Sequence, residues 1–262
     1  MSIVTDTSSG ADPKGYVLVS GASRGIGRGI ALALARAGFD LVLWGRVRAD
    51  LGDTAVAARA RGAEVICAGV DVSDPDSVST AGAESVARLH SLRGVVVNAG
   101  GATWSPIART ATTEWRNTLA TNLDGAFYTI RAGLPLLSNN PWAQLVGISS
   151  DSASFSFPTR GAYCAAKAGL ASLLETARRE HRGAGLRVSA LALSRVDTHF
   201  RGKQPGDRPE AMSISEAAAL VANVFALPRR IEIRELKASS ITTTFGPYPE
   251  HQADATRCTI DG

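Results

Sequence analysis

A tyrosine and a lysine stand four residues apart, at Tyr163 and Lys167, in a segment whose apolar residues recur at helical spacing. Residues four apart lie on one helical face, so the phenol and the ammonium can point to the same place. A free tyrosine titrates near pH ~10, and a neighbouring positive charge lowers its pKa by favouring the phenolate. The pair is therefore a candidate proton donor and acceptor. In isolation, the simpler interpretation is an aromatic core residue beside an unrelated surface lysine.

Other polar residues stand where predicted strands end. Ser150 follows one β-type run, Asn98-Ala99-Gly100 follows another, and Asn122 lies within the helical pattern after the latter. In open α/β sheets, ligands bind at the carboxyl ends of the strands. These residues are thus expected to gather with the tyrosine and the lysine at one edge of a sheet.

A glycine-rich turn follows the first predicted strand and precedes an amphipathic helical run. Its glycines, Gly21, Gly25 and Gly27, have the spacing GxxxGxG. Such a turn lets backbone N–H groups approach a pyrophosphate, whose charge the positive end of the following helix stabilises. The pattern predicts a dinucleotide site, although an ordinary tight turn can contain the same glycines.

The same turn contains a GxSxG string, as does the nucleophile elbow of α/β-hydrolases. A serine hydrolase would use Ser23 as its nucleophile, with His199 and His251 available as bases. Two features disfavour this alternative. The turn follows the first strand, whereas that fold places its elbow later, and Gly27 has no role in the hydrolase scheme.

The end of the second predicted strand lacks the acidic residue that accepts hydrogen bonds from the ribose 2′-hydroxyl of NAD. The nearest acid, Asp40, stands at the beginning of that strand. Arg46 at its end, and Arg24 in the glycine turn, are suited to form charge-assisted bonds with a 2′-phosphate. NADP(H) is therefore the expected cofactor. The alternative is that both arginines are solvated surface residues.

The elements that must position these residues alternate along the chain. Short β-type runs are separated by helical patterns, which predicts an α/β fold with a doubly wound, Rossmann-type parallel sheet of about seven strands and helices on both faces. The predicted strands span residues 16–20, 41–44, 64–68, 94–97, 144–148, 186–191 and 231–234. Residues 193–210 contain Gly, Pro and several charges and form a candidate mobile loop.

Length and composition limit the classes of protein. The 262 residues contain no linker, so residues 1–262 are expected to form a single dinucleotide-binding catalytic domain, with 1–14 and 246–262 as candidate flexible tails. The net charge of +4 and the scattered arginines argue against a nucleic-acid partner. Three cysteines without a CxxC pair indicate neither disulfides nor a metal site, and no stretch is apolar enough for a membrane span. A cytoplasmic protein is expected.

Taken together, these motifs resemble the short-chain dehydrogenase/reductase family, in its branch of single Rossmann-type domains. The resemblance extends from residue 15 to about residue 234. It rests on the motifs above, on Asp71-Val72 after the third predicted strand and on Arg195-Val196-Asp197-Thr198. It implies an NADP(H)-dependent oxidoreductase that interconverts a ketone or aldehyde with an alcohol by hydride transfer.

The resemblance also implies roles for individual residues. Tyr163 would be the general acid in reduction and the base in oxidation, while Lys167 would lower its pKa and hold the nicotinamide ribose. Ser150 would hydrogen-bond the substrate carbonyl oxygen, Asn122 would hold a water that relays protons, and Asp71 would accept from the adenine amine. The implied catalytic residues are Asn122, Ser150, Tyr163 and Lys167. The implied cofactor-binding residues are Gly21, Ser23, Arg24, Gly25, Ile26, Gly27, Arg46, Asp71, Val72, Asn98, Ala99, Gly100, Tyr163, Lys167, Val196 and Thr198.

The chain departs from the family pattern in places. Ser189, Leu193 and Ser194 replace the usual Asn and Pro-Gly. A side chain where glycine has positive φ costs about 1 kcal/mol or more, so the nicotinamide pose and affinity are expected to change. Val97 replaces an asparagine, with little expected effect. The C-terminal segment lacks the Gly-Gly of 3-oxoacyl-carrier-protein reductases, which favours a stand-alone ketone or hydroxy-compound oxidoreductase.

The expected substrate pocket is formed by residues 101–104, 151–160 and the loop around His199. Its aromatic residues indicate an apolar or aromatic substrate and a carbonyl reductase, with a core or subunit contact as the equal alternative for these rings. They are Trp104, Phe155, Phe157 and Phe200. A protein of the same fold that binds NADP(H) but is catalytically impaired is the second functional alternative.

Members of the family commonly pair through the helix that holds Asn122 and the helix that holds Tyr163. Helices with more than one apolar face can cover both a sheet and a partner, so a homodimer or homotetramer is expected. The apolar residues on the two helices are Leu119, Leu123, Phe127, Ile130, Leu170, Leu173, Leu174 and Ala177.

Overall fold

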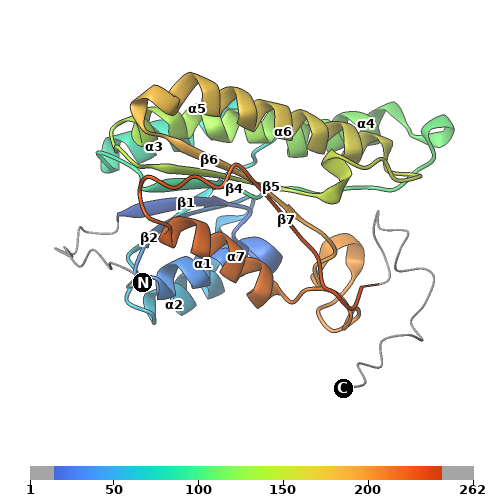
Figure 1. The fold of residues 1–262 in the computed structure, drawn as a ribbon, viewed down its shortest axis with the longest axis horizontal. Coiled ribbons are helices and arrows are strands. Elements are labelled where there is room, and N and C mark those ends of the chain that lie inside the picture. The colour runs from blue at the N-terminus through green and yellow to red at the C-terminus, as the bar shows by residue number, and fades with distance from the viewer. Residues whose placement is uncertain (1–14, 244–262) are drawn as a thin grey trace, which may run out of the picture.

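The computed structural model describes residues 15–243 and contains a seven-stranded parallel sheet between two layers of helices (Figure 1). The strands are β1 (Tyr16–Ser20), β2 (Asp40–Gly45), β3 (Val65–Gly69), β4 (Gly94–Val97), β5 (Gln144–Ser149), β6 (Arg187–Leu193) and β7 (Glu235–Ala238). Their order is β3-β2-β1-β4-β5-β6-β7, and every neighbouring pair is parallel. The predicted doubly wound α/β fold is confirmed. The candidate tails lie outside the described residues.

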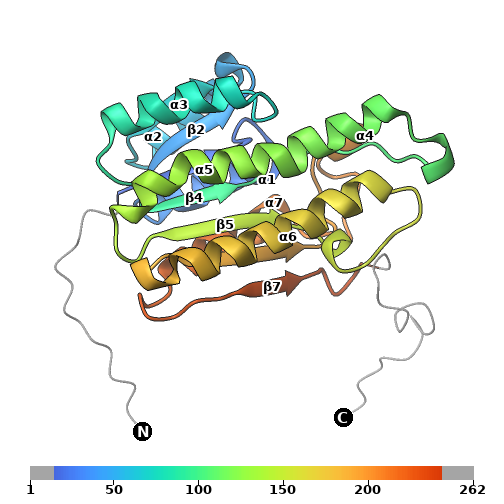
Figure 2. The same cartoon turned by 90° about the horizontal axis from the view of Figure 1, so that it is seen from above.

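The helices form a layer on each face of the sheet. They are α1 (Gly25–Arg36), α2 (Gly52–Arg59), α3 (Pro75–Arg88), α4 (Thr112–Leu119), α5 (Gly125–Ser138), α6 (Gly161–His181) and α7 (Ile214–Ala226). One face carries α1, α2 and α7, and the other carries α3, α5 and α6, with α4 in line with α5 (Figures 1 and 2). Within residues 15–243, none of these helices combines the length and the apolarity needed to cross a membrane.

Strands β1 to β6 each supply residues to two apolar cores. On β1, Val17 and Val19 belong to the core under α1 and α7, whereas Leu18 belongs to the core under α3, α5 and α6. Successive side chains of a strand point to opposite faces, so a strand covered on both sides is apolar throughout. This explains why uninterrupted apolar runs mark the strands in this sequence.

The last strand lies four residues beyond its predicted position, residues 231–234, so that prediction is wrong. Side chains of β6 form hydrogen bonds with backbone carbonyl groups of the predicted segment. Arg187 donates to the Ile231 carbonyl at 3.1 Å, and the Ser189 hydroxyl donates to the Ile233 carbonyl. Ladder pairing begins where the Ala190 N–H donates to the Arg234 carbonyl at 2.9 Å. The apolar pattern therefore marks a segment that lies along β6 without continuous strand pairing.

The candidate mobile loop, residues 193–210, carries several internal bonds. Arg195 pairs with Glu210 at 3.0 Å, and Arg208 lies 3.8 Å from Asp197 while donating to the Thr198 carbonyl at 2.7 Å. Its mobility stays a prediction. These bonds link residues near the two ends of the loop.

Candidate active site

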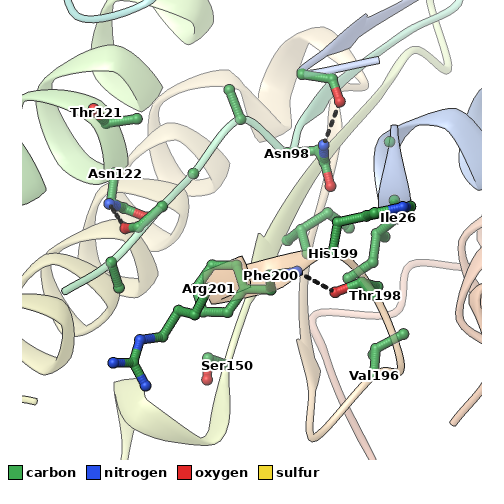
Figure 3. A pocket seen from close by; sticks show the side chains of 18 of the residues that line it. Ile26, Asn98, Thr121, Asn122, Ser150, Val196, Thr198, His199, Phe200 and Arg201 are labelled. Atoms are coloured by element: carbon green, nitrogen blue, oxygen red, sulfur yellow. Dashed lines mark hydrogen bonds between the residues drawn. The ribbon is translucent and has the colours of Figure 1, made fainter. Parts of the chain in front are cut away.

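A cavity of about 810 Å³ lies at the carboxyl ends of β1, β4, β5 and β6 (Figure 3). The strand order reverses between β1 and β4, and in doubly wound sheets a ligand crevice forms at this point. All of the catalytic and cofactor-binding residues predicted from the sequence line this cavity. Their convergence follows from the topology, because parallel strands bring the residues after them to one edge. Their roles remain predictions.

The glycine turn passes close to the loop after β4. Gly21 and Gly25 have positive φ, +67° and +57°, and a Cβ on Gly21 would lie 2.9 Å from the Ala99 Cα. A Cβ on Gly27 would lie 2.1 Å from the Gly21 carbonyl oxygen. The three glycines of the GxxxGxG motif are thus required for two reasons. Gly21 and Gly25 have positive φ, and at Gly21 and Gly27 neighbouring backbone leaves no room for a Cβ. No described side chain caps the start of α1, so its first N–H groups are available to an anion.

Asn98 braces this turn. Its side-chain amide donates to the carbonyl of Ser20 at 2.9 Å and to that of Gly21 at 3.2 Å. In return, the Ser20 hydroxyl accepts from the N–H groups of Asn98 and Ala99 at 3.0 and 3.1 Å. Ser20 is a site residue that the sequence analysis missed. The sequence feature that could have identified Ser20 is a hydroxyl residue at the end of an otherwise apolar predicted strand.

The far end of the cavity combines positive and negative charge. Arg24 and Arg46 are exposed there, and Asp71 follows β3. The Asp71 carboxylate accepts from the Ser73 N–H at 2.9 Å and from its hydroxyl at 2.6 Å. These bonds, with the charge of Arg46, hold the pKa of Asp71 below its usual value. Asp40, at the opposite end of β2, accepts from the Glu64 N–H at 2.7 Å and does not line the cavity.

The candidate proton-handling group comes from β5 and α6. Ser150 follows β5, and its hydroxyl oxygen accepts from the Ser152 N–H at 3.2 Å. Tyr163 and Lys167 lie in the first two turns of α6, with the Lys167 ammonium 5.6 Å from the centre of the Tyr163 ring. The buried ammonium donates to the Ile148 carbonyl at 2.8 Å. Lys167 is thereby held against β5 beneath the tyrosine.

Burial dominates the ionisation of both side chains. It raises the pKa of Tyr163 to about 12, against the opposing effects of the Ser150 hydrogen bond and the Arg160 charge. It lowers the pKa of Lys167 to about 8. The shift of Tyr163 is opposite to the one expected from the sequence. The reason is that the loss of water around the phenol outweighs the neighbouring positive charge in this geometry.

Asn122 lies in a π-helical turn, Ala120–Asp124, rather than in the regular helix that the sequence predicts. Its side-chain amide donates to the carbonyls of Gly101 at 2.6 Å and Thr118 at 2.9 Å. Its carbonyl oxygen is buried and has no hydrogen-bond partner among residues 15–243. A Cβ on Gly100 would lie 2.8 Å from that oxygen. The arrangement leaves a buried acceptor at the wall of the cavity, where a water or a ligand can donate to it.

Aromatic rings close over Tyr163. The Trp104 ring lies 5.4 Å from the tyrosine ring, and the Phe200 ring lies 6.2 Å from each of them. Phe157 also lines the cavity. Phe155 does not: it is 42% exposed and packs its ring on Phe157 at 4.8 Å, so its predicted place in the pocket wall is wrong.

The replacements for the family's Asn and Pro-Gly cause no backbone strain. Among the described residues other than glycine, positive φ occurs only at Trp142, Thr159 and Arg201. The Ser194 N–H donates to the Ala238 carbonyl at 2.8 Å, because pairing with β7 continues past Leu193. The expectation of a strained side chain at this point is therefore wrong.

The described structure does not support the serine hydrolase alternative, in which a histidine would activate Ser23. Within the described part of the chain, the His199 Nδ1 is buried without a hydrogen-bond partner, so it does not bond the Ser23 hydroxyl. His251, the second base considered, lies outside the described residues. The turn around Ser23 is explained by close packing of its glycines.

Known proteins are similar to this chain in sequence and in fold. A family model described as short chain dehydrogenase matches residues 15–208. Sepiapterin reductase of Chlorobaculum tepidum is 30% identical over 231 residues, which make up 85% of this chain and 95% of that protein. An alcohol dehydrogenase from the archaeon Thermococcus sibiricus, complexed with 5-hydroxy-NADP, aligns with a TM-score of 0.83 and 29% identity over 87% of this chain and 97% of that one. Carveol dehydrogenase from Mycobacterium avium, in complex with NAD, aligns with a TM-score of 0.75 and 25% identity over 85% and 95% of the two chains.

Proposed function

Because the chain belongs to the short-chain dehydrogenase/reductase family, we propose that it is an NADP(H)-dependent oxidoreductase that interconverts a carbonyl compound and an alcohol. The activity proposed is that of a carbonyl reductase on an apolar or aromatic substrate. One observation carries the proposal. The same cavity joins the glycine turn, two exposed arginines and the group formed by Ser150, Tyr163 and Lys167.

The residues of the cavity fit a nicotinamide dinucleotide. The backbone at Gly21 and Gly27 has no room for a Cβ, and the uncapped start of α1 can accept a pyrophosphate. The buried Asn122 oxygen offers an acceptor that no donor in the described part of the chain uses. Asp71 is poised as an acceptor at the adenine end, and Arg46 lies beside it.

The proton chemistry follows from the surroundings of Tyr163. When bound, the nicotinamide supplies the hydride that the carbonyl carbon accepts. Tyr163 donates its phenolic proton to the carbonyl oxygen, and Ser150 orients that oxygen with a hydrogen bond. Lys167 stabilises the phenolate that remains. A pKa of about 12 keeps Tyr163 protonated at neutral pH, as a proton donor must be.

The choice of NADP(H) over NAD(H) rests on this chain's own arginines, since the similar solved structures include complexes with an NADP derivative and with NAD. In a fluorescence titration, the protein is expected to bind NADPH more tightly than NADH. Arg46→Ala should weaken NADPH binding by about tenfold, through loss of charge-assisted bonds to the 2′-phosphate, and leave NADH binding unchanged.

Arg88→Ala is the matched control, because Arg88 is exposed at the end of α3 and does not line the cavity. It should change neither affinity. Tighter binding of NADH than of NADPH by the unmodified protein would contradict the role given to Arg46.

We also propose that the protein forms a homodimer or homotetramer whose subunits contact one another through α5 and α6. Much of the predicted stripe on α6 faces the sheet: Leu170, Leu174 and Ala177 are buried in the core. On α5, Phe127 is 42% exposed, and the guanidinium of Arg131 lies over the Phe127 ring, 5.2 Å from the ring centre. A partner would therefore meet the outer face around Phe127. The cytoplasmic location stays a prediction.

A further inference from the structure

The substrate end of the cavity is lined by an excess of positive charge. Among the described lining residues, this end has one carboxylate, Asp151. Glu210 pairs with Arg195 at 3.0 Å, and Asp197 lies 3.8 Å from Arg208. The cationic side chains are Arg160, Arg195, Arg201, Lys203 and Arg208. Among the described residues, cationic side chains therefore outnumber carboxylates at this end of the cavity.

Two of these arginines meet at one aromatic ring. The guanidinium carbons of Arg160 and Arg201 lie 4.6 and 4.7 Å from the centre of the Trp104 ring, which itself lies 5.4 Å from the Tyr163 ring. Arg160 also lies 4.4 Å from the centre of the Phe157 ring. Figure 3 shows Arg201 next to Phe200 among the residues that line the cavity. Both guanidinium groups are thus held one ring away from the proposed proton donor.

The backbone beside both arginines has an unusual conformation. Arg201 itself has a φ of +61°, and Thr159, which precedes Arg160, has a φ of +66°. Such conformations cost about 1 kcal/mol or more at residues other than glycine and persist where surrounding structure maintains them. Here they accompany two side chains that converge on one ring from different segments of the chain.

The convergence of like charges is electrostatically unfavourable. Burial lowers the pKa of Arg160, and the charges of Arg201 and Arg195 lower it further. An anion bound near these groups would offset the repulsion, and the planar guanidinium matches the geometry of a carboxylate. The rings of Trp104 and Phe157 offer apolar surface at the same place.

We propose that the substrate carries a carboxylate on an aromatic or apolar frame, and that Arg201 and Arg160 bind this carboxylate while the carbonyl group faces Tyr163 and Ser150. The inference rests on the proposed carbonyl reductase function and names its substrate class. Arg201 sets the preference for an acidic substrate. Trp104 positions both guanidinium groups.

Matched acid and ester substrates test the inference. With NADPH, 3- and 4-formylbenzoate are expected to be reduced with a kcat/KM at least tenfold higher than their methyl esters, mainly through KM. Arg201→Gly should remove the guanidinium and raise KM for the acids by about 30-fold, with less than a twofold change for the esters. Because the positive φ at this position favours glycine, the variant is expected to remain folded.

Two further variants control this comparison. Arg201→Lys keeps the charge without the planar fork and should recover part of the acid preference. Arg88→Gln, outside the cavity, should leave the preference unchanged. Equal kcat/KM values for acids and esters in the unmodified protein would overturn the carboxylate inference and leave the carbonyl reductase function standing.

Calorimetry separates the inference from the function on which it rests. Benzoate and methyl benzoate are titrated into the protein saturated with NADP⁺, and benzoate alone is expected to bind in an Arg201-dependent manner. If no carbonyl compound is reduced while benzoate still binds through Arg201, the acid site stands and the proposed reaction fails. If benzoate binds no more tightly than its ester, or equally to the Arg201→Gly variant, the acid site is overturned.

Discussion

Tyr163→Phe is expected to lower kcat for carbonyl reduction by about three orders of magnitude while NADPH affinity stays nearly unchanged. General acid catalysis contributes about 10²–10⁴-fold, and the proposed mechanism has no second proton donor at this position. The variant removes one hydroxyl and retains the ring, which packs against Trp104 at 5.4 Å and Phe200 at 6.2 Å. The loss should therefore arise from chemistry rather than from packing.

Steady-state kinetics and a fluorescence titration with NADPH measure the two quantities. Tyr128→Phe is the matched control, because Tyr128 lies on α5 and does not line the cavity; it should keep full activity. Full activity of Tyr163→Phe would refute the assigned proton donor. If the unmodified protein binds NADPH and turns over none of the carbonyl compounds offered, the catalytically impaired alternative becomes the better account.

Lys167→Met is expected to abolish most turnover and, at the same time, to stabilise the cofactor-free protein near neutral pH. Burial lowers the pKa of Lys167 from 10.5 to about 8, which corresponds to about 3 kcal/mol of unfavourable free energy in the charged, folded form. The bond from its ammonium to the Ile148 carbonyl is also lost, at a cost of about 1 kcal/mol. A net increase of about 1–2 kcal/mol in the free energy of unfolding is expected below pH 8.

The stability difference between Lys167→Met and the unmodified protein is expected to depend on pH. Between pH 8 and 10.5, the unfolded state binds more protons at this lysine than the folded state does, so its contribution to stability improves as pH rises. The advantage of Lys167→Met should therefore be largest below pH 8 and shrink towards pH 10. Urea denaturation of both proteins at pH 6, 8 and 10 measures it.

Comparing the two proteins at each pH isolates Lys167 from Tyr163, whose raised pKa makes stability fall above pH 10 in both. Lys203→Met, in an exposed part of the loop, is the control and should show no such trend. A Lys167→Met variant that is less stable than the unmodified protein at pH 6 would contradict the buried-charge interpretation.

The topology and the composition of the site could be predicted because they depend on local patterns. The apolar runs of β1 and β4, each ending in polar residues, identify strands whose carboxyl ends meet at one edge. The four-residue spacing of Tyr163 and Lys167 places them on one helical face. Strand alternation then brings Asn98, Ser150 and the glycine turn together without any knowledge of side-chain contacts.

Features that depend on packing between distant segments could not be predicted. The start of β7 is decided by Arg187 and Ser189 on the neighbouring strand, which bond the backbone ahead of it. The raised pKa of Tyr163 depends on burial by several segments, and that burial outweighs a local charge effect. The meeting of Arg160 and Arg201 at Trp104 requires the conformations of three loops that carry no periodic signal.

Transfer of deuterium from [4,4-²H₂]NADPH to product tests the central claim most directly. Carbonyl compounds with and without a carboxylate are incubated with the protein, and the alcohols are analysed by mass spectrometry. We expect one deuterium at the carbinol carbon in the reaction of the unmodified protein, and at most a trace of product with Tyr163→Phe. Bound NADPH with no deuterated alcohol from any compound, or equal deuterium transfer by Tyr163→Phe, would contradict the account.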